Sequence, residues 1–119
     1  MYKDANITLM VSDFNESVHF YTELIGLTLQ FRDGDEWAEV VAPGVKIGLH
    51  HGGKAENGTR PQRDMSTSIG FEVEDLESAV ATLTSRGVEF GPIGEGDEVI
   101  RSARFTDPDG LTLYLYQMK

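Results

Sequence analysis

The segments VSDFNESV, residues 11–18, and VEDLESAV, residues 73–80, decide the fold, because the second nearly repeats the first at an offset of 62 residues. Two further matches follow in the same order: Gly26–Leu29 with Gly87–Phe90, and Ala42–Ile47 with Asp107–Leu113. Self-similarity at a fixed spacing is typical of a duplicated structural module. One such match arises easily by chance, whereas three in order predict two modules of the same kind.

Each half shows the same order of predicted elements. A strand of alternating character ends just before an aspartate, Asp13 or Asp75, whose carboxylate can accept from the free N–H groups of a helix start. Helices are expected at residues 14–25 and 76–86, each followed by a glycine. Three more strands follow each helix, with a Pro/Gly turn before the last. The sequence therefore predicts an α+β fold of two tandem βαβββ modules.

The boundaries follow from a polar, turn-rich stretch at residues 51–67, which we expect to link the modules. Module one is expected at residues 1–55 and module two at residues 66–119, within a single domain of residues 1–119.

Composition excludes several classes of function. Twenty acidic residues against ten basic ones give a net charge of −10, which disfavours nucleic acid as a partner. The absence of cysteine excludes disulfides, zinc–thiolate sites and a cysteine nucleophile. No apolar run approaches the length of a membrane span. We therefore expect a cytoplasmic protein that binds neither nucleic acid nor membrane.

Strand alternation separates two faces, because side chains repeat with period two. One face carries aliphatic and aromatic triplets and is expected to pack on the helices. The opposite face carries the residues that we expect to line a ligand pocket: Asn6, Thr8, Met10, Trp37, Glu39, Gly48, His50, Ser68, Arg104 and Tyr114. A solvent-facing sheet or a dimer contact is the alternative, but a pocket enclosed by curled sheets would shelter Trp37, Met10 and Tyr114 better.

Two motifs resemble those of one family. FYTELIGL, residues 20–27, resembles the FYxxxLG(L/F) helix end of the vicinal oxygen chelate superfamily, and FTDPDG, residues 105–110, resembles its FxDPDG turn before the last strand. That superfamily includes glyoxalase I, bleomycin resistance proteins and extradiol dioxygenases. The resemblance implies the glyoxalase/bleomycin resistance fold and a homodimer.

The metal-dependent members of this superfamily use four ligand positions, usually His or Gln, Glu, His and Glu. The resemblance puts these positions at Asn6, Gly48, Ser68 and Tyr114 in this sequence. None of these is a usual ligand for a divalent transition metal. The chain is therefore most similar to the metal-free, bleomycin-resistance-like branch, and we expect no metal, no cofactor and no catalytic residue.

Three functions remain open at this stage. The favoured one is a small-molecule-binding protein that sequesters a cationic or aromatic drug or metabolite, since acidic residues attract cations and aromatic faces stack. The alternative is a lyase, isomerase or dioxygenase that uses a relocated metal at His50, Glu39 and Glu72, or His50 as a metal-free general base. The third is an assembly domain whose pocket is filled by its own side chains.

Overall fold

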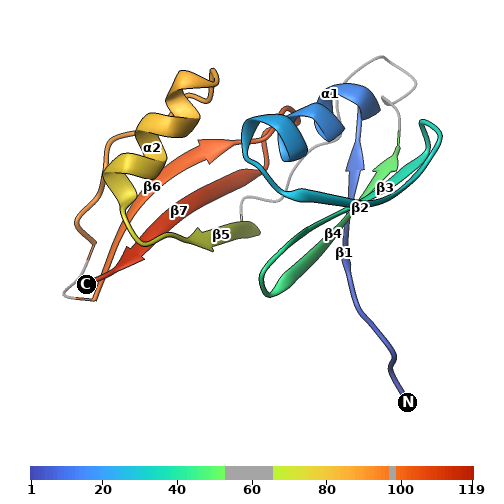
Figure 1. Ribbon diagram of the computed structural model, residues 1–119, viewed down its shortest axis with the longest axis horizontal. Helices are drawn as coiled ribbons and strands as arrows, with labels where there is room; N and C mark the ends of the chain where they lie inside the picture. Colours follow the sequence, from blue (N-terminus) through green and yellow to red (C-terminus); the bar gives the residue numbers. More distant parts are fainter. Residues whose placement is uncertain (53–65, 97–98) are drawn as a thin grey trace. The chain divides into compact units, whose positions relative to one another are not determined.

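The computed structural model describes residues 1–52, 66–96 and 99–119 (Figure 1). The chain divides into two compact units, Met1–Gln62 and Arg63–Lys119, and each is described by itself. Most of the expected linker, residues 51–67, lies outside the described residues, so the module bounds and the single domain stay predictions. No helix among the described residues is long and apolar enough to cross a membrane.

Unit 1 has the predicted order of strand, helix and three strands. Its elements are β1 (Ile7–Val11), α1 (Phe14–His19), the π-helix η1 (Phe20–Leu24), β2 (Thr28–Asp33), β3 (Trp37–Ala42) and β4 (Val45–His51). The sheet order is β1-β4-β3-β2, with β1 parallel to β4 and the other neighbours antiparallel.

The helix expected at residues 14–25 is an α-helix that widens into a π-helix. It begins where the Asp13 carboxylate accepts from the Glu16 N–H at 3.0 Å. It ends where the Ile25 N–H donates to the Phe20 carbonyl at 3.0 Å, five residues back, before Gly26 at φ 81°. Two consecutive aromatic rings, Phe20 and Tyr21, are buried in this wider turn and meet edge to face at 5.1 Å.

Unit 2 repeats this connectivity with one difference. Its elements are β5 (Ser68–Glu72), α2 (Leu76–Ser85), β6 (Ile100–Thr106) and β7 (Thr112–Met118), in the sheet order β5-β7-β6. The first strand expected after α2 is reduced to an isolated bridge between Gly94 and Ser102 and one further bond from Gly91 N–H to the Arg104 carbonyl. Pro92 supplies no N–H, and the flanking glycines weaken a strand.

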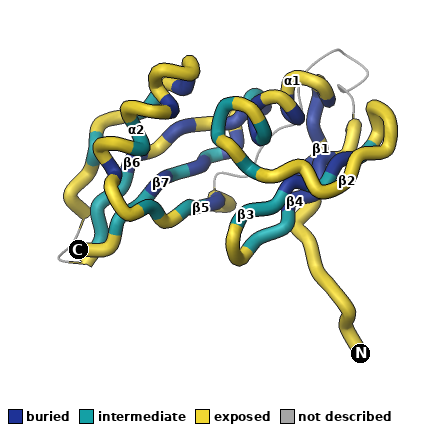
Figure 2. The backbone as a smooth tube through the Cα atoms, in the orientation of Figure 1, coloured by how far each residue is buried: buried dark blue, intermediate teal, exposed yellow. Residues whose placement is uncertain are grey.

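Each core lies between the helix and one face of the sheet. In Figure 2 buried positions alternate with half-buried ones along β7, as they do along β3, whereas β2 is exposed throughout. Fully buried side chains come from Tyr21, Val11, Val40, Ile47 and Leu49 in unit 1, and from Leu76 and Leu113 in unit 2. Most residues of the face predicted to form the core are buried, but Ile7 is 49% exposed at the start of β1, and Val45, Phe71 and Val73 are only half-buried.

The FTDPDG motif forms the turn that precedes β7. The buried Asp107 carboxylate accepts from the backbone N–H groups of Asp109, at 3.0 Å, and Leu111, at 2.8 Å. Gly110 closes the turn at φ 88°, a conformation that favours glycine. The aspartate therefore organises the backbone before the last strand.

Candidate functional site

The predicted site residues of unit 1 share the sheet face that points away from α1. Strand register pairs Thr8 with Gly48, Met10 with His50, and Trp37 with His50. Glu39 also pairs with Gly48. Asn6 immediately precedes β1, and its side-chain oxygen accepts from the Thr8 hydroxyl at 2.8 Å. Unit 1 therefore brings its expected residues together along three adjacent strands.

Trp37 lies over Gly48. A Cβ added to Gly48 would approach Cζ2 of the Trp37 indole to 2.8 Å, closer than atoms pack in proteins. The His50 ring lies beside the indole, with ring centroids 6.1 Å apart. Because Gly48 has no side chain, the six-membered ring of the half-buried indole can pack directly against the backbone of β4.

The edge of this face holds an ion pair between Lys46 on β4 and Asp4 in the N-terminal segment. The Lys46 amine donates a hydrogen bond to the Asp4 carboxylate, and this bond raises the pKa of Lys46. The negative charge of Glu39 raises the pKa of Lys46 further. The same hydrogen bond lowers the pKa of Asp4. Lys46 is therefore engaged with carboxylates of its own chain.

The predicted site residues of unit 2 also share one sheet face. Register pairs Ser68 with Thr112, and pairs Tyr114 with both Gly70 and Arg104. A Cβ added to Gly70 would collide with the Tyr114 phenol ring, so this ring also rests on a glycine. Tyr116 lies next along β7, with its ring centroid 5.8 Å from that of Tyr114. Each unit thus carries one aromatic ring packed over a glycine of the neighbouring strand.

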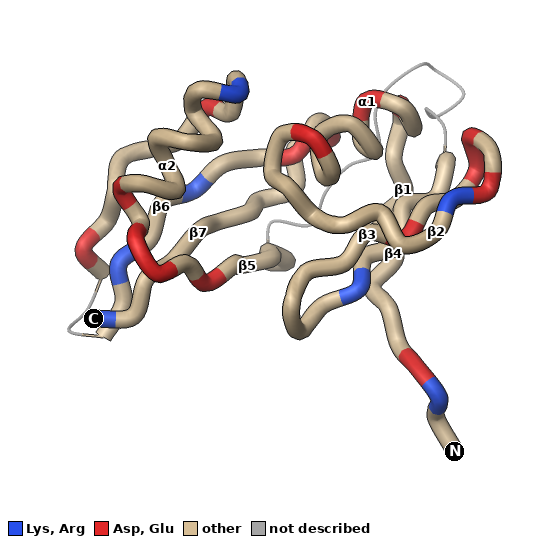
Figure 3. The backbone as a smooth tube through the Cα atoms, viewed as in Figure 1, with Lys and Arg blue, Asp and Glu red and all other residues tan. Residues whose placement is uncertain are grey.

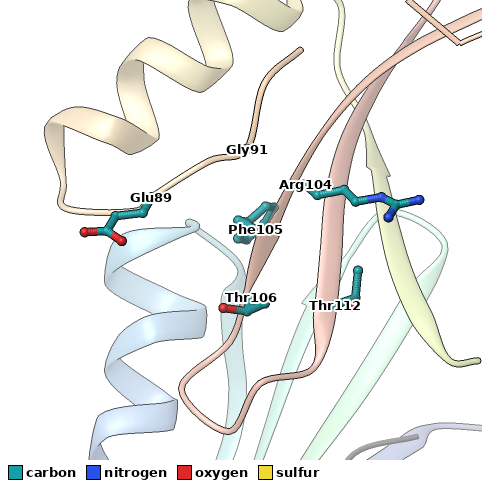
Figure 4. A pocket seen from close by; sticks show the side chains of 6 residues that line it. All are labelled: Glu89, Gly91, Arg104, Phe105, Thr106 and Thr112. Atoms are coloured by element: carbon teal, nitrogen blue, oxygen red, sulfur yellow. The ribbon is translucent and has the colours of Figure 1, made fainter. Parts of the chain in front are cut away.

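A pocket of about 270 Å³ opens beside β6 in unit 2 (Figure 4). It is lined by Glu89, Gly91, Arg104, Phe105, Thr106 and Thr112. Of these, only Arg104 was expected from the sequence. Thr112 is two residues from Tyr114 on β7, so strand alternation alone places it on the same face of the sheet. Glu89 and Gly91 could not be found that way, because their segment is irregular.

The four positions at which the resemblance implies metal ligands do not fit a divalent transition metal. Gly48 has no side chain and is covered by Trp37, and the Tyr114 ring lies against Gly70. Asn6 and Ser68 contribute an amide and a hydroxyl, which are weak ligands for such ions. Within residues 1–52, 66–96 and 99–119, no three His, Asp or Glu side chains are grouped so that they could hold a metal ion.

Fold and site together define a class of small α+β proteins made of duplicated βαβββ modules with polar and aromatic residues on one face of each sheet. A family model described as the Glyoxalase/Bleomycin resistance protein/Dioxygenase superfamily matches residues 5–115. The chain belongs to this superfamily.

Individual relatives agree with this assignment. The chain is 30% identical to the uncharacterised protein YaeR of Escherichia coli, over 94% of this chain and 93% of YaeR. It is 33% identical to the glutathione transferase FosA of Serratia marcescens, over 93% of this chain and 77% of FosA. The crystal structure of TnmS3, an antibiotic-binding protein from Streptomyces sp. CB03234, covers all of this chain and is matched over 99% of its own, with a TM-score of 0.71 and 24% identity. The last likeness concerns the fold alone.

Proposed function

We propose that the chain is a small-molecule-binding protein of this superfamily that takes an aromatic ligand without a metal ion. One observation carries the proposal: in each unit an aromatic ring, Trp37 or Tyr114, lies over a glycine of the adjacent strand. A half-buried ring that packs on a sheet leaves the rest of its surface open for stacking with a planar ligand.

The metal-ligand positions support the same proposal. A catalytic metal usually takes three protein ligands and keeps one open position. The residues Asn6, Gly48, Ser68 and Tyr114 offer no imidazole and no carboxylate. A ligand of this protein is therefore held by stacking and by polar side chains, and we assign no cofactor and no catalytic residue.

A thermal-shift titration of EDTA-stripped protein with Ni²⁺, Zn²⁺, Mn²⁺, Fe²⁺ and Mg²⁺ tests the metal-free part. A ligand that binds only the folded state raises the unfolding midpoint, by roughly 2.7 kcal/mol of stability at a hundredfold excess over its Kd. We expect no saturable rise. A saturable rise with one metal that is lost in His50→Ala would overturn the proposal and favour a metal-dependent lyase or dioxygenase.

A second candidate function rests on the 33% identity to the glutathione transferase FosA. It is an enzyme of the same superfamily, acting through a relocated metal or through His50 as a general base. A glutathione-transfer assay with and without added Mn²⁺ separates the two. Turnover that requires His50 favours the enzyme, and its absence in protein that binds aromatic probes favours the binding protein.

We also propose that the protein is a cytoplasmic homodimer. The dimer is supported by the exposed apolar side chains Ile7, Met10, Leu29 and Phe31 of unit 1, which a partner would cover. The expectation that the two sheet faces line a common pocket stays a prediction.

A further inference from the structure

The Arg104 guanidinium has no ion-pair or hydrogen-bond partner among the described residues. Two other basic side chains of unit 2 form ion pairs. Arg101 pairs with Glu77 and Glu95, and Lys119 pairs with Glu95. Arg104 instead lines the pocket beside β6. The chain has a net charge of −10, and acidic side chains predominate (Figure 3). Among the described residues that line the pocket, Arg104 is the one basic side chain.

Polar and aromatic groups surround Arg104 on the same sheet face. Arg104 pairs with Tyr114, and Thr112, two residues before Tyr114, pairs with Ser68. Cross-strand neighbours have Cβ atoms roughly 5 Å apart, and alternate residues along a strand lie about 7 Å apart. Figure 4 shows the Arg104 and Thr112 side chains on the same side of their strands. A guanidinium, a threonine hydroxyl and a phenol ring therefore lie within the span of one small molecule, with Ser68 one strand farther from Arg104.

Gly70, which lies beneath Tyr114, determines which part of the phenol ring a ligand can reach. With no Cβ on Gly70, the phenol ring packs against the backbone of β5. One ring face is thereby turned to the sheet, and the half-buried ring keeps its other face for a ligand. The positive charge of Arg104 stands at one side of this surface.

We infer that unit 2 binds the carboxylate of an aromatic acid, with the carboxylate on Arg104 and the arene on Tyr114; this inference rests on the proposed function. The guanidinium presents paired N–H donors that match the two oxygens of a carboxylate. The hydroxyl of Thr112, which lines the same pocket as Arg104, can donate to one of these oxygens. A bound aromatic cation would instead meet a like charge at Arg104.

The overall charge of the molecule does not reverse this preference. The net charge of −10 favours cationic ligands, as the sequence alone predicts. At physiological ionic strength, however, charges in water are screened over about 8 Å. A guanidinium in contact with the ligand therefore outweighs carboxylates farther away. Glu89, which also lines the pocket, extends away from Arg104 in Figure 4.

Three probes of the same ring system separate charge from stacking: 1-naphthoate, 1-naphthalenemethanol and 1-naphthylmethylammonium. Binding of each to the native protein is measured by isothermal titration calorimetry at physiological salt. We expect 1-naphthoate to bind most tightly. Arg104→Gln should weaken the affinity for 1-naphthoate by roughly 10- to 100-fold, the usual effect of losing a hydrogen-bonded charge partner. It should leave the affinity for the neutral probe unchanged.

Two variants control the result. Arg104→Lys keeps the charge but loses the paired donors, and we expect an affinity between those of the native protein and Arg104→Gln. Arg86→Gln makes the same change of charge at the exposed end of α2 and should bind 1-naphthoate as the native protein does. An unchanged thermal unfolding midpoint shows that each variant is folded.

The outcomes distinguish this inference from the proposed function. If the neutral or cationic probe binds and 1-naphthoate does not, or if Arg104→Gln binds 1-naphthoate as the native protein does, the carboxylate site is wrong and the aromatic-binding function stands. If none of the three probes binds the native protein, the proposed function fails and the inference fails with it.

Discussion

Gly48 is the residue whose replacement tests the aromatic surface of unit 1 most directly. In Gly48→Ala the new methyl group would occupy the space of the Trp37 indole, so the ring must swing away from the sheet. Because a side-chain end moves more easily than backbone, we expect a loss of only about 1 kcal/mol of stability, at the low end for overpacking. Trp37 is the single tryptophan of the chain, so its fluorescence reports the change.

We expect the emission of Gly48→Ala to shift to the red as the indole gains water. Gly91→Ala serves as the control, because the atom nearest to its added Cβ is the Arg104 carbonyl oxygen at 4.0 Å. Its emission should match that of the native protein. An unshifted emission in Gly48→Ala would mean that the indole does not rest on Gly48.

The sequence predicts the site only in part, and single residues show why. Strand parity places Trp37, Gly48, Arg104 and Tyr114 on one face without any structure, because alternation is a local property of the chain. That Trp37 and Tyr114 each cover a glycine depends on register between strands, which parity does not give. Glu89 escapes prediction because its segment is irregular.

At the scale of elements, the two aspartate caps are matched features of the two modules. Asp75 accepts from the Ser78 N–H at 3.0 Å, as Asp13 does from the Glu16 N–H in unit 1. Asp75→Ala should lose about 1 kcal/mol of unfolding free energy, because a helix-start N–H loses its acceptor. Asp75→Asn keeps an acceptor oxygen and should lose much less. Urea denaturation of the two variants makes the comparison, and equal losses would exclude a capping role.

An ion-pair group fastens α2 to β6 and gives stability a defined dependence on pH. Arg101 on β6 donates to Glu77 at the start of α2, and this hydrogen bond holds the pKa of Glu77 below its usual value. A carboxyl group whose pKa is lowered by folding stabilises the folded state above its unfolded pKa, near 4.5. That stabilisation is lost as pH falls through the lowered, folded-state pKa.

Glu77→Gln should therefore be less stable than the native protein at neutral pH, and the difference should vanish in acid. Because both partners are near the surface, the difference is small and falls with added salt. Thermal unfolding at a series of pH values from 7 down through the acid range measures it. Glu74→Gln, two residues before α2 begins, should show no such convergence. A difference in stability that does not narrow as pH falls would assign the effect to something other than the Glu77 charge.

The elements themselves were largely predictable. Asp13 and Asp75 mark both helix starts, and Gly26 follows the first helix as expected, because caps are encoded by single residues. Two details were not. The end of the first helix is a π-helix, and the strand expected after α2 survives only as a bridge at Gly94. The π-helix depends on backbone hydrogen bonding that apolar periodicity does not encode. For the lost strand, Pro92 and the flanking glycines were a signal in the sequence that apolar periodicity alone does not weigh.

At the scale of the whole molecule, the exposed apolar surface of unit 1 bears on assembly. Every residue of β2 is exposed, and β2 forms one edge of the sheet. Phe31 and Leu29 on this strand are 53% and 43% exposed. An open strand edge with apolar side chains invites pairing unless something covers it. A second copy of the chain is the partner that the family resemblance implies.

Sedimentation equilibrium of the native protein should accordingly give a mass of about 26 kDa, twice the 13.2 kDa of one chain. Phe31→Glu should shift the mass toward 13.2 kDa, because a carboxylate buried in an interface without a partner is costly to desolvate. Phe31→Leu keeps the apolar contact and should remain dimeric. A native protein that stays monomeric at high micromolar concentration would contradict the dimer. A dimer that survives Phe31→Glu would place its interface on another surface, away from β2.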